Sequence, residues 1–593
     1  MAFPILTGIN DPVTSWSWRA STRAYSTDQY FHKEEEDETV IYAFKPSFSK
    51  KDWFAPENMS SFGEIKMNRD HFPCMRSFSK DLDATVNEAF LKNLEVLFST
   101  SFSDSVKTVV DSRRSQRIVF TGHSSGGASA ILATVWYLET YFKKQSGVFP
   151  EPLCLTFGAP LVGDYVFKHA LRREDWSRFF MNFVTRFDIV PRIMLAQKAS
   201  TNQTLPYALS QLNHTVSIQE NDQSTAGFYA TVMTDVETAA HEASFGNDKI
   251  MFSEENSSHL ELSPYRSAGT FVFSTGTRLV SMNNSDAILQ ILFYASQSTN
   301  EQELSQRPYQ SIRDHRSYQE MLDSVAMESL HHLPLDGVYV LSDFGLTKHA
   351  KKCVHAAFEA DKKRVDNQSK IDAKLPRIVA KLTWIEKDYK LRCRTLRKGY
   401  YDSFKESNEE EDFIANVIRA ELAGSFDEVL VLLKKGQLPD GFEGRSVWIN
   451  LATRYRRLME PLDIANYHRF SKNEDTGSYM EKGRPNRYKH AQRLYEHDLL
   501  IKAGRTAEEI QASSYGSFFW TEYEELRGKQ YEYDEERVKK LEELLEGCIR
   551  DKEVDDEHIF LEGSSFRKWW HSLPEHHKRY SPLQERMNYI RDS

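Results

Sequence analysis

The sequence predicts two structural classes in one chain, an α/β fold over residues 1–345 and an all-α fold over residues 350–593. In the first part, short runs of β-branched and aromatic residues alternate with helical patterns, as in βαβ units that build a mainly parallel sheet. In the second part these runs fade, and long charged amphipathic segments such as 353–370 and 535–555 take their place. The stretch 333–347 contains Pro, Gly and Asp, which favour a connecting loop between the two parts. A chain of 593 residues is long enough for two cores.

The composition is that of a folded globular protein, with 40% hydrophobic and 27% charged residues. The formal net charge of −10 argues against broad affinity for nucleic acids or anionic membranes, so we expect no direct nucleic-acid partner. No apolar run reaches the ~18 residues that a membrane-spanning helix needs, and the first residues lack the pattern of a secretory signal. The five cysteines are scattered without a CxxC pair, which indicates reduced structural thiols. We therefore expect an intracellular protein without a transmembrane segment, a metal site or a cofactor.

Apolar runs in the first part predict four strands and a long helix. The strands are expected at 40–44, 117–120, 153–157 and 182–187. The helix is expected over residues 126–142, because this segment starts with small residues and then presents a long apolar face. Small residues at its start would let it pack closely on a sheet.

The segment 117–128, RIVFTGHSSGGA, contains a G-x-S-x-G pattern between a predicted strand and this predicted helix. A serine hydroxyl becomes a useful nucleophile when a tight, strained turn holds it out of the sheet, and flanking glycines keep the neighbouring backbone free of clashes. We therefore predict that Ser124 occupies the nucleophile elbow of an α/β-hydrolase fold, and that the backbone N–H of Ser125 donates to an oxyanion. The alternative is a chance match, in which Ser124 only caps the helix.

An α/β-hydrolase needs an acid and then a histidine after the serine in chain order. Asp188 fits the acid, because it closes the strand NFVTRF and would lie at the carboxyl edge of the sheet. An aspartate in a turn before a proline is also common for purely structural reasons. We choose His315 as the histidine, because it follows the apolar segment 287–294 late in the domain, where the last loop of the fold belongs. The other downstream histidines are interpreted as surface or core residues: His214, His241, His259, His331 and His332.

Several segments resemble known families. Three are similar to class 3 lipase signatures: GHSSGGA at 122–128, LTFGAPLVGD at 155–164 and FDIVPR at 187–192. The whole chain resembles the plant enhanced disease susceptibility family, which also includes phytoalexin-deficient and senescence-associated lipase-like proteins. This second resemblance is carried by TGIN at 7–10, SSFGEIKMNR at 60–69 and SIRDHRSY at 311–318.

The resemblance implies the catalytic triad Ser124, Asp188 and His315, but one loop argues against efficient hydrolysis. Lipases of this fold take a second oxyanion donor from a loop after an early strand. Here that loop is residues 44–47, Phe-Lys-Pro-Ser, in which Pro46 has no N–H and no glycine stands beside it. Loss of one such donor typically costs about 100- to 1,000-fold in turnover. The family resemblance likewise implies a lipase-like scaffold whose signalling does not depend on hydrolysis.

The stretch between Asp188 and His315 is longer than one connection needs, and we interpret it as carrying a lid or a docking surface. The resemblance implies that a helix in this region inserts into a hydrophobic groove of a partner's lipase-like domain. The matching segment is 249–262, KIMFSEENSSHLEL, whose expected docking residues are Ile250, Met251, Phe252 and Leu260. Asn256 and His259 stand where an apolar stripe is expected, which weakens the expected contact. The alternative is an ordinary surface helix or loop.

In the helical part, segment 453–497 interleaves ten Arg or Lys side chains with five tyrosines. Guanidinium groups match phosphate oxygens and tyrosine rings stack on bases, so the segment suits a phosphorylated or nucleotide ligand. The alternative from composition is a solvated basic face balanced by acidic helices.

The sequence Glu-Pro-Leu at 460–462 resembles the core of the family's C-terminal EP domain. This resemblance implies a cavity, shared within heterodimers, that binds ADP-ribose-type nucleotides. It places Phe413, Lys472 and Arg487 at the cavity, and Phe470 replaces a histidine of relatives.

The resulting hypothesis is a non-enzymatic immune signalling hub. The resemblance implies heterodimers with related lipase-like proteins of the phytoalexin-deficient or senescence-associated type, an ADP-ribose-type nucleotide at the dimer cavity, and helper immune receptors as further partners. It also implies a location in nucleus and cytoplasm, and the basic cluster at 362–364 fits nuclear import, although such short runs are usually helix surface. Two alternatives stay open: a working serine esterase or lipase, and a protein that dimerises through both domains without a small ligand.

Overall fold

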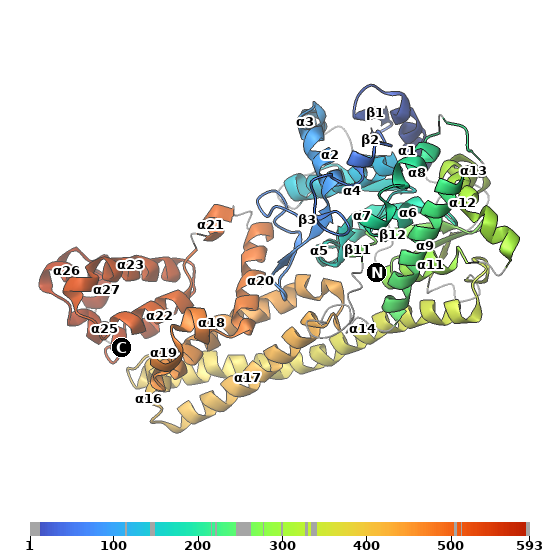
Figure 1. Cartoon of the computed structure of the whole chain (residues 1–593). Coiled ribbons are helices and arrows are strands. Elements are labelled where there is room, and N and C mark those ends of the chain that lie inside the picture. The colour runs from blue at the N-terminus through green and yellow to red at the C-terminus, as the bar shows by residue number, and fades with distance from the viewer. Residues whose placement is uncertain are drawn as a thin grey trace. The chain divides into compact units, whose positions relative to one another are not determined.

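The computed structural model describes residues 12–112, 116–142, 149–214, 216–219, 222–244, 263–276, 278–297, 300–325, 330–333, 341–502, 507–511 and 513–588. The chain, shown in Figure 1, divides into two compact units. The first comprises Met1–Asp366 and Lys435–Gly441, and the second comprises Asn367–Lys434 and Phe442–Ser593. The division falls inside helix α14 (Lys348–Thr383), C-terminal to the boundary predicted at 345–350, which stays a prediction.

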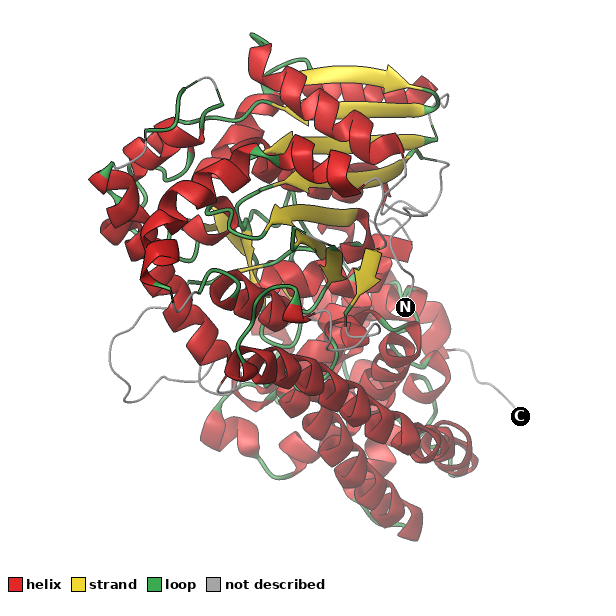
Figure 2. Ribbon diagram, turned by 90° about the vertical axis from the view of Figure 1, so that its right-hand side faces the viewer, coloured by secondary structure: helices red, strands yellow, loops and turns green. Residues whose placement is uncertain are grey.

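An eight-stranded sheet forms the centre of the first unit, with the order β1-β2-β7-β8-β10-β12-β13-β14. Its strands are β1 (Phe31–Glu36), β2 (Thr39–Phe44), β7 (Arg117–His123), β8 (Glu151–Phe157), β10 (Phe180–Thr185), β12 (Thr270–Ser274), β13 (Leu279–Met282) and β14 (Leu330–His332). Two pairs, β1 with β2 and β12 with β13, are antiparallel, and the other neighbours are parallel. Figure 2 shows the strands as yellow arrows among the red helices. The four predicted strands correspond to β2, β7, β8 and β10, and the predicted α/β class is confirmed.

Helices and short strands surround this sheet. The helices are α1 (Pro12–Arg23), α2 (Glu88–Phe98), α3 (Phe102–Ser112), α4 (Ser125–Tyr137), α5 (Tyr165–Arg173), α6 (Val190–Ile193), α7 (Lys198–Thr201), α8 (Leu205–Leu212), α9 (Gln223–Ser244), α11 (Ser285–Tyr294), α12 (Glu301–Arg316) and α13 (Tyr318–Val325). A second sheet has the order β11 (Tyr265–Arg266), β9 (Gly163–Asp164), β6 (Thr85–Asn87) and β3 (Glu64–Lys66), and β4 (Arg76–Ser77) pairs with β5 (Leu82–Asp83). The helix predicted at 126–142 corresponds to α4 and the π-helical turn that follows it over Leu138–Phe142.

Both faces of the large sheet are covered, because alternate side chains of one strand pack against different helices. Ile41 of β2 belongs to an apolar cluster that includes Trp18 of α1. The next residue, Tyr42, points to the opposite face and contacts the ring of Phe102 in α3 at 5.6 Å between ring centroids. This two-sided burial explains why β2 is an unbroken apolar run, TVIYAF, rather than an alternating one.

The described residues of the second unit form helices. After α14 come α15 (Lys390–Thr395), α16 (Tyr400–Glu406), α17 (Glu410–Lys434), α18 (Ser446–Arg469), α19 (Lys472–Thr476), α20 (Asn486–Lys502), α21 (Ala507–Gln511), α22 (Gly516–Leu526), α23 (Tyr531–Arg550), α24 (Asp556–Ile559), α25 (Ser565–His571), α26 (Glu575–Tyr580) and α27 (Gln584–Asn588). Short π-helical segments occur at Trp384–Tyr389 and at Tyr479–Gly483.

Helix α18 is the centre of this unit, because it is buried on nearly all of its faces. The ring of Tyr455 stacks between Phe426 of α17, at 3.8 Å between centroids, and Tyr488 of α20, at 5.3 Å. Glu460 is buried and forms an ion pair of 2.6 Å with Arg484. Glu460, the glutamate of the Glu-Pro-Leu sequence at 460–462, therefore holds the residues just before α20 against α18.

Asp440, although it follows α17 in the chain, belongs to the first unit. Its carboxylate lies 3.1 Å from Lys168, 3.2 Å from His169 and 3.5 Å from Arg172, all on α5. Burial opposes ionisation of Asp440, but these three basic groups hold its pKa well below the usual range. A buried carboxylate therefore anchors the 435–441 segment on α5.

The described helices include none that is both long and apolar enough to cross a membrane. All five cysteines are buried as free thiols. Burial raises the pKa of Cys154 to about 12, which makes this thiol unreactive.

We predict that Asp440→Asn destabilises the full-length protein by about 3–5 kcal/mol, because it leaves the buried Lys168 ammonium beside a neutral amide. Since the folded-state pKa of Asp440 is depressed, its contribution is present above about pH 4 and is lost as the pH falls through the folded-state pKa. Urea denaturation followed by circular dichroism measures the change. The exposed Asp28 provides a control, because Asp28→Asn should stay within about 0.5 kcal/mol of the wild type. Equal stability of both variants would contradict the role of Asp440.

Candidate functional site

Ser124 lies on a sharp turn between β7 and α4. Its backbone angles, φ 55° and ψ −136°, are strained for a residue with a side chain. Two glycines make the turn possible. A Cβ on Gly122 would lie 2.3 Å from the carbonyl carbon of Gly126, and a Cβ on Gly126 would lie 2.3 Å from the carbonyl oxygen of Phe44. This is the geometry of a nucleophile elbow.

The structure brings Asp188 and His315 together. His315 Nδ1 lies 2.9 Å from Oδ2 and 3.0 Å from Oδ1 of Asp188. The same carboxylate accepts hydrogen bonds from the N–H of Val190 at 2.8 Å and from the hydroxyl of Tyr318 at 2.7 Å. Arg192 is fully buried, donates to the carbonyl oxygen of Asp188 and so fixes the turn that presents the carboxylate.

His315 was expected in a loop but lies in the last turn of α12. The loop expectation came from chain order alone, and the SIRDHR segment continues a helix that begins at Glu301. Tyr318, the first residue of α13, is three positions later and reaches the same carboxylate. Tyr318 belongs to the motif SIRDHRSY, but the sequence alone does not predict its contact with Asp188.

Ser124 and His315 are not joined by a hydrogen bond. Ser124 Oγ and His315 Nε2 are both buried without a hydrogen-bond partner, and Ser124, Asp188 and His315 are each 0% exposed. A void lined by Ile189 and Ile312, close in sequence to Asp188 and His315, has a volume of only ≈ 10 Å³. Pockets for small molecules usually have about 300–1,000 Å³. This void is therefore too small for a small-molecule ligand, and its lining does not include Ser124 or His315.

His123, between Gly122 and Ser124, packs against the candidate triad. Its ring stacks on that of His315 at 4.3 Å between centroids. Its Nε2 lies 2.9 Å from the carbonyl oxygen of His315, and its Nδ1 contacts the hydroxyl of Tyr25. Burial lowers the pKa of His123 well below its usual value, so the ring is neutral, with Nε2–H donating to the carbonyl and Nδ1 accepting from Tyr25. No feature of the sequence other than its place in the motif predicts that His123 packs against His315.

The 44–47 loop does not supply the second oxyanion donor that lipases of this fold take from this position. The N–H of Lys45 donates to the carbonyl of Tyr30 at 3.0 Å, and Pro46 has no N–H. The N–H of Ser47 donates to Ser125 Oγ at 2.8 Å, and Ser125 Oγ in turn donates to the Ser47 carbonyl at 3.0 Å. The polar groups of the loop and of the start of α4 therefore hydrogen-bond to each other. The N–H of Ser125 is the remaining candidate oxyanion donor at the elbow.

The other histidines lie in different surroundings. His214 contacts the ring of His123 edge-on at 5.2 Å, and burial lowers its pKa to about 4. His241 is exposed on α9. His259 and the side chains of His331 and His332 lie outside the described residues.

The three residues expected at a nucleotide cavity lie on separate helices of the second unit. Phe413 is 67% exposed on α17, Lys472 is exposed at the start of α19, and Arg487 is half-buried on α20. No hydrogen bond or ion pair within the described part of the chain joins these three side chains. Phe470 is exposed at the end of α18.

Arg487 is bound within the protein. Its guanidinium donates to Asp463 at 2.8 Å, to Asp427 at 3.0 Å and to the hydroxyl of Tyr455 at 2.9 Å. Asp463 is buried and also binds Arg419, whereas the side chain of Asp427 is 50% exposed. An anionic ligand at Arg487 would therefore compete with Asp427.

The expected docking residues Ile250, Met251, Phe252 and Leu260, with Asn256 and His259, lie outside the described residues. Their role stays a prediction.

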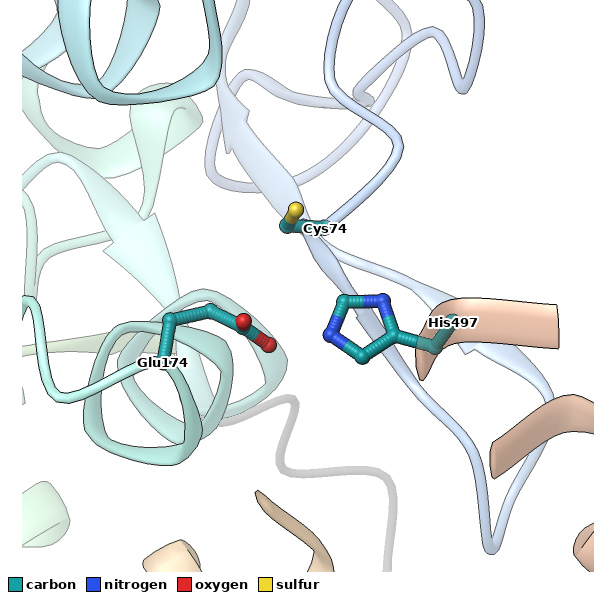
Figure 3. A group of neighbouring side chains, drawn as sticks. All are labelled: Cys74, Glu174 and His497. Atoms are coloured by element: carbon teal, nitrogen blue, oxygen red, sulfur yellow. The ribbon is translucent and has the colours of Figure 1, made fainter. Parts of the chain in front are cut away.

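Figure 3 shows two residues of the first unit, Cys74, which is buried, and Glu174, which is half-buried. The N–H of Cys74 donates to Glu139 at 2.8 Å, and Glu174 forms an ion pair of 2.7 Å with Arg173. His497, also labelled there, belongs to the second unit.

Comparison with known proteins matches both parts of the chain. The family model described as "Enhanced disease susceptibility 1 protein EP domain" matches residues 380–586, and that described as "Lipase (class 3)" matches residues 42–198. Protein EDS1B of Arabidopsis thaliana is 57% identical and covers 99% of this chain and 98% of its own length. Lipase-like PAD4 of the same plant is 25% identical over 74% of this chain and 69% of its own. Senescence-associated carboxylesterase 101 is 24% identical over 91% and 83%.

The sheet order, the elbow at Ser124 and the class 3 lipase match define a lipase-like α/β-hydrolase unit followed by a helical EP unit. The identity to Protein EDS1B over essentially the full length of both proteins decides the family. The chain belongs to the enhanced disease susceptibility 1 (EDS1) family.

We predict that Gly158→Ala disrupts the candidate triad. Gly158 has φ +55°, and a Cβ there would lie 2.3 Å from Asp188 Oδ2 and 2.9 Å from His315 Nδ1. The backbone strain alone costs about 1–3 kcal/mol, so the melting temperature should fall by several degrees in differential scanning fluorimetry. Gly227 on α9 is a matched control in the same unit, because a Cβ there meets nothing within 4 Å. Gly227→Ala should leave stability unchanged or raise it by about 1 kcal/mol. The same melting temperature for Gly158→Ala and the wild type would disprove this packing.

Proposed function

We propose that this protein is a lipase-like regulator of plant innate immunity that acts by assembly rather than by hydrolysis. The observation that carries the proposal is the 57% identity to Protein EDS1B over the whole chain, within a family named for disease susceptibility. The closed surroundings of Ser124 support the non-enzymatic part. An acyl substrate would have to reach Ser124 Oγ, which is buried, and would need a second oxyanion donor, whereas the N–H of Ser47 is bound to Ser125 Oγ.

As partners, we propose related lipase-like proteins of the PAD4 or senescence-associated type, which would form heterodimers with this chain. Both relatives share sequence with it over much of its length. The docking element would be the segment 249–262, whose apolar residues suit insertion into a groove.

As ligand, we propose an ADP-ribose-type nucleotide held at the heterodimer's helical units near Phe413, Lys472 and Arg487, with helper immune receptors engaged by the loaded dimer. The exposed Phe413 ring offers a stacking surface for a base. Arg487 offers a guanidinium for phosphate, and its position is fixed by Asp463 and Tyr455.

We propose that the protein occupies nucleus and cytoplasm. The family resemblance supports this more than the basic cluster does, because Arg364 of that cluster is ion-paired with Asp361. Lys362 and Lys363 remain exposed.

The rival function is a serine esterase, and the strained elbow with the Asp188–His315 contact favours it. In this mechanism Ser124 Oγ attacks an acyl carbonyl, His315 Nε2 takes its proton, and Asp188 holds the imidazole through Nδ1. Ser124 and His315 would first have to approach each other, and the site would have to open.

We predict that a fluorophosphonate probe labels the purified protein no faster than its Ser124→Ala variant, because Ser124 Oγ is buried and lacks a hydrogen bond to a base. In-gel fluorescence of the probe measures labelling, and a commercial class 3 lipase verifies that the probe is active. Rapid labelling that is lost in Ser124→Ala would instead support the esterase.

We predict opposite effects for two substitutions at the proposed nucleotide site. Arg487→Ala should abolish binding of ADP-ribose to the purified heterodimer, whereas Asp427→Asn should tighten it by about 2- to 5-fold by removing an exposed competing carboxylate. Isothermal titration calorimetry measures both. Asp475→Asn, an exposed change on α19, is the charge-matched control. The proposal fails if Arg487→Ala binds ADP-ribose as the wild type does.

A further inference from the structure

We propose that the second unit contains a binding pocket for a small organic anion, formed by α16, α18, α22 and the chain after α23. The pocket has a volume of ≈ 650 Å³ and lies entirely within the second unit. Its lining contains none of Phe413, Lys472 and Arg487, so it is separate from the proposed nucleotide site. Figure 1 shows the labels of α16, α18 and α22 close together, and α18 packs against both other helices.

Aromatic and aliphatic side chains form one part of the lining. Tyr401 of α16 stacks on Trp520 of α22 with 3.8 Å between ring centroids and 6° between ring planes. Tyr400, Leu458 and Ile549 also face the pocket. The stacked pair is rigid, and it provides an apolar surface for the body of a ligand.

The carboxylates that line the pocket are all neutralised by basic groups. The pairs are Glu386 with Arg454 at 2.6 Å, Glu553 with Arg456 and Arg457 at 2.7 and 2.9 Å, Asp555 with Lys390 at 3.1 Å, and Asp556 with Arg586 at 3.5 Å. Glu553 therefore faces two guanidinium groups and balances one of them. The lining itself carries four basic and four acidic side chains, and the ion-pair partners Arg456 and Arg586 outside the lining bring the balance to six basic against four acidic groups.

Lys552 supplies a further unbalanced charge. It lines the pocket and is exposed, and its ammonium has no ion-pair partner among the residues that the structure describes. Its backbone is left-handed, with φ 54°, an uncommon conformation for lysine that is often associated with functional sites. Arg454 and Arg457 lie one helical turn apart on α18, so they face the pocket together with Lys552.

Two buried polar atoms in the lining lack hydrogen-bond partners. Thr453 Oγ1 and His558 Nδ1 are both unpartnered, and these residues are only 9% and 6% exposed. Burial lowers the pKa of His558 to about 4, so its ring is neutral at pH 7. Buried polar atoms are normally hydrogen-bonded, so these two indicate groups that a ligand satisfies.

The π-helical segment Trp384–Tyr389 carries Glu386 to the pocket. π-Helical turns are rare and frequently occur at functional sites. Here the segment places Glu386 against Arg454, which orients that guanidinium along the wall.

These features define the class of ligand. A carboxylate or phosphate group would bind Lys552 and the arginine pair, and a ring or short apolar body would lie against Tyr400, Tyr401 and Trp520. The volume suits a molecule of drug size rather than a macromolecular segment.

The test uses the full-length purified protein in phosphate-free buffer and four probes: phenyl phosphate, benzoate, inorganic phosphate and phenol. Saturation-transfer NMR and isothermal titration calorimetry measure binding. Phenyl phosphate or benzoate should bind saturably, and the tighter of the two identifies the preferred acidic group. Inorganic phosphate should bind more weakly, because it lacks the ring, and phenol should not bind saturably, because it lacks the charge. No saturable binding of either aromatic anion would overturn the proposal.

Variants locate the binding. Lys552→Asn removes the charge with a residue that tolerates left-handed backbone, and Arg454→Gln removes an exposed guanidinium. Each should weaken binding about tenfold, whereas Lys540→Asn, the same change on an exposed face of α23, should leave it unchanged. Arg487→Ala should also leave it unchanged, which separates this pocket from the proposed nucleotide site. Binding that persists in Lys552→Asn and Arg454→Gln, or that is lost in Arg487→Ala, would refute the assignment.

Discussion

The close approach of three backbone segments at the carboxyl edge of the large sheet is the constraint on which the lipase-like unit depends. At the elbow after β7, a Cβ on Gly126 would lie 2.3 Å from the carbonyl oxygen of Phe44. In the turn after β8, a Cβ on Gly158 would lie 2.3 Å from Asp188 Oδ2. Gly126 and Gly158 are the residues at these two contacts. Any side chain there would push the strands apart or displace Asp188, so the shape of the site follows from backbone packing before any catalytic role is considered.

The same close packing leaves Ser124 buried and engages the polar groups around it. Ser125 Oγ and Ser47 exchange hydrogen bonds, which satisfies the polar groups of the loop but leaves the Ser47 N–H unavailable to an oxyanion. His123 stacks on His315 and fills the space beside it. An elbow geometry and an Asp–His contact therefore coexist in this protein with a buried serine hydroxyl.

Much of this organisation could be predicted from the sequence, because it depends on local patterns. The four strands and the helix after Ser124 follow from apolar runs, and Asp188 follows from its position at a strand end. The structure places His315 beside Asp188, but in α12 rather than in a loop, because chain order does not report secondary structure. The loss of the second oxyanion donor was inferred from Pro46, whereas the capture of the Ser47 N–H by Ser125 needs tertiary contacts between distant segments.

In the helical unit, sequence and structure differ for a physical reason. The basic residues of segment 453–497 suggested a positive surface, yet many of them are bound to carboxylates from other helices, as Arg484 is to Glu460 and Arg487 is to Asp463. An arginine that is already paired with a carboxylate is held in place but has little charge left to attract a ligand. A phosphate that binds it gains only the difference between the arginine–phosphate interaction and the arginine–carboxylate interaction that it replaces. An anion would therefore bind this unit best where a cation is exposed or shares one carboxylate with another cation. Arg487 meets this condition through the exposed Asp427, and Lys552 with Arg457 meets it without displacing any group.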